Sequence, residues 1–138
     1  MANPNIVNVA TINGGNLGFN LSNTLTATLA TVSADVIVKV NQISIANVDG
    51  SSAANVDIFV DGMGSGATGF TGTGEDATVY LAKTIAVPAD STLLLLSNPI
   101  YLMEGDILKG GASASGDLDC FISYEALAPP FNISPSIK

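Results

Sequence analysis

The stretch EGDILKGGASASGDLDCFISYEAL (104–127) contains a turn, a short strand, a loop of small residues and an alternating strand. In the alternating part, Asp117 and Asp119 alternate with Leu118 and Cys120. A period of two is typical of a strand with one face on a core. The two aspartates are therefore expected on the exposed face, and Cys120 is expected to be a buried small hydrophobe.

The rest of the chain is also rich in strand signals and poor in helix signals. Val, Ile, Thr, Gly, Asn and Ser are frequent, and no window shows an apolar stripe at helical spacing. Runs bounded by turn residues predict further strands, within 5–12, 17–21, 24–32, 35–48, 55–61, 77–88, 92–97 and 98–106. We count about eight strands in all, which favours a single-domain, jelly-roll-like β-sandwich over an open meander.

Three local features refine this prediction. Gly14-Gly15 is expected to break the first strand, and the run 92–97 is expected to be buried on both faces. Within 35–48 the apolar residues of the alternating pattern occupy even positions up to Val40 and odd positions from Ile43 onward. A parity switch moves side chains to the opposite face, so a bulge or bend is expected near Asn41-Gln42.

The chain has 138 residues, which predicts one domain with its own core. We expect an N-terminal arm or first strand over 1–16, a sandwich over 17–127 and an extended tail over 128–138. Cys120 is the single cysteine, so no internal disulfide can form.

The acidic composition of the chain limits the classes of molecule that it is expected to bind. Twelve acids and four lysines give a net charge of −8, and Arg, His and Trp are absent. Nucleic acids and anionic membranes are bound through basic surfaces, so both are disfavoured as partners. The N-terminal sequence MANPNIVNVATINGG lacks the basic and apolar regions of a signal peptide, and the chain is expected to be a soluble protein made in a reducing cytoplasm.

The acids of the opening stretch allow two interpretations. Glu104 and Asp106 could pair as general acid and base, or bind Ca²⁺ together with Asp117 and Asp119. The alternative, which we favour, is that Glu-Gly-Asp forms a turn between strands. The Asp-Gly pairs in 47–50 and 59–62 do not have the spacing of an EF-hand, so no metal is predicted, although a Ca²⁺ site of another design stays open.

Two segments are candidates for protein interaction. The Gly-rich stretch 62–76 lacks a Walker ending and predicts a protruding hairpin loop that carries Met63 and Phe70. The tail PPFNISPSIK carries Phe131, Ile133 and Ile137, which either pack locally or extend onto a neighbouring subunit. Histidine-based triads are excluded, and we predict no catalytic residue, no cofactor and no enzymatic activity.

The segments VKVNQISIANVDGSSAANVDIFVDG (38–62) and YLAKTIAVPADSTLLLLSNPIYLMEGDILKGGASASGDLDCFISYEAL (80–127) add a family resemblance. Together with the opening MANPNIVNV, they resemble small virion structural proteins of tailed bacteriophages, prominently those of marine cyanobacteria. The resemblance covers about residues 1 to 127. It implies a virion component rather than an enzyme, whereas the Gly-rich stretch and the tail depart from the pattern.

The leading hypothesis is a capsid decoration or cement protein, a homotrimer that bridges subunits of the major capsid protein. It would be assembled in the host cytoplasm and would lie on the capsid surface, with 1–16 and 128–138 as contact segments. One alternative is a protein of the tail, neck or fibres. Another is a carbohydrate-binding module for host attachment, with glycan binding dependent on Ca²⁺ or on Tyr101 and Tyr124.

Overall fold

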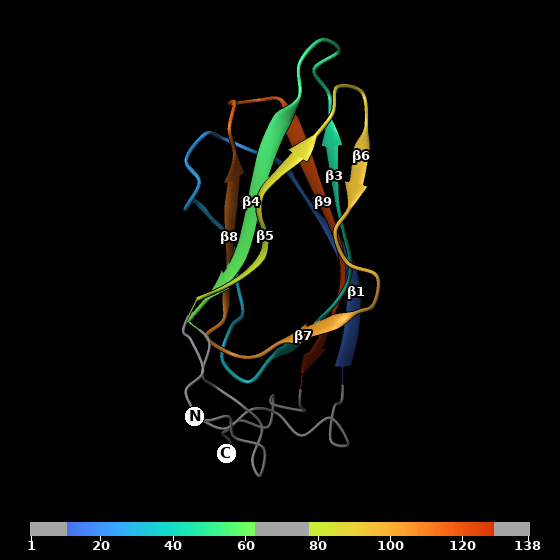
Figure 1. Cartoon of the computed structure of the whole chain (residues 1–138). Helices are drawn as coiled ribbons and strands as arrows, with labels where there is room; N and C mark the ends of the chain where they lie inside the picture. Colours follow the sequence, from blue (N-terminus) through green and yellow to red (C-terminus); the bar gives the residue numbers. More distant parts are fainter. Residues whose placement is uncertain (1–10, 63–77, 129–138) are drawn as a thin grey trace, which may run out of the picture.

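The protein is a sandwich of two antiparallel sheets in the computed structural model, which describes residues 11–62 and 78–128 (Figure 1). The strands are β1 (Thr11–Asn20), β2 (Thr28–Thr31), β3 (Ile37–Asn47), β4 (Ala54–Asp61), β5 (Val79–Val87), β6 (Thr92–Leu94), β7 (Ile100–Leu102), β8 (Ile107–Ala112) and β9 (Leu118–Ala128). The all-β sandwich predicted from the sequence is confirmed. No helix in the described residues is long and apolar enough to cross a membrane.

The strand order is that of a jelly roll. Sheet A has the order β1-β9-β3-β6, with β7 also paired to β3, and sheet B has the order β2-β8-β4-β5. The pairs are nested, because Thr11 pairs with Ala128 near the chain ends and Ala54 pairs with Val87 near the middle. The chain is therefore one long antiparallel ribbon that is folded into two sheets.

The predicted strand count agrees with this topology. Both β6 and β7 pair with β3, over Ser44–Ala46 and Val38–Val40 respectively. These two short strands thus share one position beside β3, and the other strands fill the remaining positions of an eight-stranded jelly roll. The predicted run 24–32 is a strand only over β2.

The predicted break at Gly14-Gly15 is wrong. Strand β1 runs through both glycines, and Gly15 pairs with Tyr124 of β9. A Cβ atom at Gly15 would lie 2.6 Å from the Tyr124 hydroxyl oxygen. The glycine therefore leaves room for an aromatic ring on the neighbouring strand and does not end its own strand.

The prediction for residues 92–97 is also wrong. Only Thr92–Leu94 is a strand, and 61% of Leu94 is exposed. The leucine pairs with Ser44 at the margin of sheet A, and its side chain faces solvent. The continuous leucine run is typical of a buried strand, but the position of β6 at the sheet margin leaves one face uncovered.

The predicted bulge in the third strand is confirmed. The register between β3 and β9 shifts between Val40 and Gln42. Val40, Ile43 and Ile45 are all buried in the core, at 2%, 0% and 0% exposure, although their spacing in the sequence changes parity. The bulge therefore keeps both halves of β3 facing sheet B.

Two glycines in β8 allow close packing within sheet B. A Cβ atom at Gly110 would overlap the backbone oxygen of Asp57 on β4, and one at Gly111 would overlap the backbone oxygen of Thr24. Backbone atoms cannot move away as easily as the end of a flexible side chain. Gly110 and Gly111 are therefore required by tertiary contacts.

We predict that Gly110→Ala lowers the free energy of unfolding by about 1–3 kcal/mol, because the added methyl group overpacks the β4–β8 contact. Gly50→Ala is the matched control, since its nearest neighbours are Asp90 carboxylate oxygens at 3.7 and 3.8 Å. This control should change stability by less than about 0.5 kcal/mol. Urea unfolding followed by circular dichroism measures both, and equal stabilities would contradict the packing argument.

Candidate functional site

All three segments that lie outside the described residues are attached to the same end of the sandwich. This junction end holds Thr11, Gly62, Thr78 and Ala128, where the described chain stops or resumes (Figure 1). Thr11 pairs with Ala128, and the Cβ position of Gly62 lies 2.8 Å from the backbone oxygen of Gly105. The fold therefore attaches segments 1–10, 63–77 and 129–138 to one end of the domain.

The predicted interaction residues belong to those segments. Met63 and Phe70 follow Gly62 in the chain, and Phe131, Ile133 and Ile137 follow Ala128. All five lie outside the described residues, so their role remains a prediction. The topology does bring the attachment points of their segments to the same end of the domain.

The Glu-Gly-Asp turn lies at the junction end and is confirmed as a turn. The backbone N–H of Asp35 donates to Glu104 Oε1 at 2.9 Å, and that of Met103 donates to Asp106 Oδ2 at 2.9 Å. The backbone of Val32 also bonds to this turn, through its N–H to Asp106 and its oxygen to Gly105. The Glu104 carboxylate and the Val32 backbone thus join loop 32–36 to turn 103–106, whereas the Asp106 carboxylate bonds within the turn itself.

These acids are more buried than turn chemistry alone predicted. Glu104 is 7% exposed and Asp106 is 4% exposed. Burial raises the pKa of Asp106 above its ordinary value of 3.8, and the hydrogen bond from Met103 opposes part of that shift. The ionised carboxylate of Asp106 is therefore held in place at a cost in desolvation.

The four acids of the opening stretch do not meet in one site. Glu104 and Asp106 lie at the junction end, whereas Asp117 directly before β9 and Asp119 within it lie at the other end of the sandwich. Asp119 is exposed, as predicted, and accepts a hydrogen bond from Asn20 Nδ2 at 2.7 Å. Within the described residues, no group of three or more His, Cys, Asp or Glu side chains could hold a metal.

A polar cluster at the junction end was not predicted from the sequence. Lys109 Nζ lies 2.9 Å from Asp61 Oδ2, and Thr78 Oγ1 donates to Asp61 Oδ1 at 2.7 Å. The N–H of Gly62 also donates to Asp61 Oδ1, at 3.0 Å. The cluster therefore connects the end of β4 to β8 through Lys109. It also connects Asp61 to Thr78, which lie before and after segment 63–77 in the chain.

This cluster lowers the pKa of Asp61 from 3.8 to about 2. The hydrogen bond from Lys109 is the largest cause, followed by those from Thr78 and Gly62. Asp61 and Lys109 are 48 positions apart, and no local pattern connects them. A sequence signal for the pair was absent because sheet pairing alone brings the two side chains together.

The two tyrosines of the carbohydrate-binding alternative lie on opposite faces of sheet A. Tyr101 is 48% exposed and pairs with Lys39, whereas Tyr124 pairs with Val40 and faces sheet B. Adjacent positions on a strand point to opposite faces. The two rings therefore cannot form one stacking surface for a sugar.

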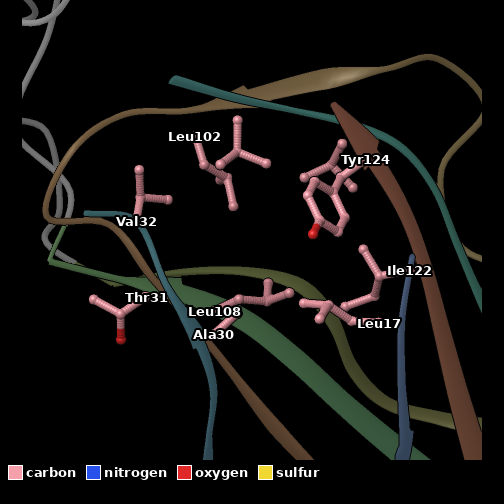
Figure 2. Close-up of a pocket in the computed structure, with 10 residues that line it drawn as sticks. Leu17, Ala30, Thr31, Val32, Leu102, Leu108, Ile122 and Tyr124 are labelled. Carbon is pink, nitrogen blue, oxygen red and sulfur yellow. The ribbon is translucent and has the colours of Figure 1, made fainter. Parts of the chain in front are cut away.

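Tyr124 lines an apolar cavity of about 170 Å³ between the sheets (Figure 2). The walls come from both sheets and include Leu17, Val38, Leu102 and Leu108. Figure 2 shows the tyrosine hydroxyl directed toward this space. Apart from Tyr124, none of the lining residues carries a titratable side chain, so the cavity contains no acid–base pair.

Cys120 is a buried hydrophobe, as predicted. It is 1% exposed, and burial raises the pKa of its thiol from 9.0 to about 12. The thiolate is the nucleophilic form of cysteine, so this thiol is chemically inert at neutral pH.

Comparison with models of protein families, with curated proteins and with solved structures found no match.

We predict that the Asp61 cluster stabilises the fold above about pH 4 and that its contribution is lost as the pH falls toward 2. The sign follows from the lowered pKa, since the unfolded chain binds the proton at higher pH than the folded chain. The difference in unfolding free energy between the natural protein and Asp61→Asn should shrink over that range. In a Lys109→Gln background the pH dependence of this difference should be much weaker, and an unchanged dependence would contradict the assignment.

Asp106 should show the opposite pH dependence. Its raised pKa means that the folded chain binds the proton first, so the stability of the natural protein relative to Asp106→Asn should rise as the pH falls toward 3.8. At pH 7 Asp106→Asn should be at least as stable as the natural protein, because the amide oxygen still accepts from Met103. Asp106→Ala should lose about 1–3 kcal/mol, because the Met103 N–H loses its partner.

Proposed function

We propose that this chain is a non-enzymatic structural protein of a tailed-phage virion, and that it decorates or cements the capsid. The proposal combines the resemblance to phage virion proteins with one structural observation. All segments that carry the predicted interaction residues attach to a single end of a well-packed domain. A protein that bridges shell subunits needs such a contact surface and needs no reaction centre.

The chemistry of the described residues is consistent with this role. The cysteine is buried, the Glu-Gly-Asp acids bond to backbone N–H groups, and Lys109 is paired with Asp61. The two acids and the Lys109–Asp61 pair stabilise loops and strand ends at the junction end. In the proposed role they give the contact segments a rigid base.

The net charge indicates the kind of surface to which the protein binds. A net charge of −8 favours association with a basic surface and speeds the encounter at low ionic strength. We propose that the partner is the major capsid protein and that three copies of the chain associate on the shell. Addition of salt should then slow binding to the particle.

The first experiment is the copy number per purified virion of the phage that encodes the chain, measured by quantitative mass spectrometry against the major capsid protein. We expect hundreds of copies, because a decorating protein follows the lattice of the shell. A few to a few tens of copies would contradict capsid decoration and would favour the tail, neck or fibres. Absence from the virion would contradict a structural role.

A binding experiment then tests the junction end. Particles that lack the protein are mixed with the purified natural chain or with the variant Phe131→Ser, Ile133→Ser, Ile137→Ser, and bound protein is measured after sedimentation. The variant should bind at least about tenfold more weakly, since each lost anchor removes on the order of 1 kcal/mol or more. Val48→Ser, at an exposed position near the opposite end, is the control and should bind normally.

A further inference from the structure

Three of the four sheet margins are protected against pairing with another chain. The β2 margin has four residues and a register irregularity, and the β5 margin has two irregularities and an exposed Lys83. The third margin consists of β6 and β7, which have three residues each and are separated by a segment with Pro99. Short strands, bulges, lysine and proline are the usual means of blocking such edges.

The margin formed by β1 has none of these features. It has ten residues, TINGGNLGFN, without a charge or a proline, and its register with β9 has no shift. Ile12, Gly14, Asn16, Gly18 and Asn20 are all exposed. Within the described residues, no strand pairs with the outer side of β1. A long, uncharged edge of this kind is a template for another strand.

The hydrogen-bond pattern shows which residues of β1 direct their backbone N–H and C=O groups away from β9. The N–H of Leu21 donates to the oxygen of Leu118 at 2.8 Å, which continues the β1–β9 register. Bonding alternates along an antiparallel strand, so the odd-numbered residues of β1 bond to β9. The even-numbered residues therefore direct their backbone N–H and C=O groups outward: Ile12, Gly14, Asn16, Gly18 and Asn20.

Two of these outward residues are glycines that the fold itself does not require. A Cβ atom at Gly14 or Gly18 would meet nothing within 4 Å, and neither glycine has a left-handed backbone. In contrast, Gly15 is required by the Tyr124 ring. Glycine in a strand often marks a place where another backbone approaches closely.

We infer that β1 pairs with β1 of a second copy, antiparallel and about a twofold axis at Asn16. The five outward residues are symmetric about Asn16, so Gly14 faces Gly18 of the second copy and Ile12 faces Asn20. An antiparallel pair of identical strands is self-complementary. The strand carries no charge although the chain has a net charge of −8, so the seam brings no like charges together.

This inference does not depend on the proposed function. A trimer requires contacts between different surfaces, and the protected margins do not provide a suitable second strand for β1. The twofold contact therefore joins two single chains, or links two trimers if the chain also forms trimers through another surface. In either case, loss of the contact halves the mass of the assembly.

Sedimentation equilibrium of the full chain, from low to high micromolar concentration, tests the contact. Asn16→Lys places two ammonium groups opposite each other at the axis, and it should weaken the association at least about tenfold and halve the mass. Asn98→Lys makes the same change at an exposed loop position and should leave the association unchanged. Circular dichroism checks that both variants fold.

A cross-link tests the register. Hydrogen-bonded antiparallel partners have Cα atoms about 5.5 Å apart, within the range of a disulfide of about 4.4–6.8 Å. Asn16→Cys should therefore form a covalent dimer under mild oxidation, whereas Asn98→Cys should not, and buried Cys120 does not compete. A single-chain mass at all concentrations, or an assembly unaffected by Asn16→Lys, would overturn the inference and leave the β1 edge to a strand of another protein.

Discussion

The nested pairing of the two halves of the chain is the constraint on which the rest of the structure depends. Thr11 pairs with Ala128 at the outside of the ribbon, and Val60 pairs with Val79 near its middle. Because each strand finds its partner in the other half, nearly every stabilising contact is long-range. The same nesting places Thr11, Ala128 and the two attachment points of segment 63–77 at one end of the domain (Figure 1).

Close packing of the ribbon depends on small residues and on buried polar contacts. Gly110 lets β8 approach β4, and Gly15 accommodates the ring of Tyr124. At the junction end, Glu104 and Asp106 accept hydrogen bonds from the backbone N–H groups of Asp35 and Met103. The acids of the Glu-Gly-Asp turn are thus structural groups, and the burial of Asp106 has a desolvation cost because its carboxylate loses contact with water.

Two surfaces of the domain have different properties. The junction end carries the attachment points of the predicted contact segments. The polar cluster of Asp61, Lys109 and Thr78 stabilises this end. The β1 edge is a regular, uncharged strand with bare glycine backbone on its open side. The proposed shell contact therefore uses the junction end, whereas the proposed contact with a second copy uses the β1 edge.

The sequence by itself determined the fold class, most strand positions, the bulge near Gln42 and the burial of Cys120, because these follow from alternation and turn residues over short distances. Only the tertiary structure decided that β1 runs through Gly14-Gly15, that Leu94 faces solvent and that Asp61 meets Lys109. These features depend on which strands become neighbours and which lie at the sheet margins. Strand pairing across the whole chain sets those neighbours, and no local pattern in the sequence records it.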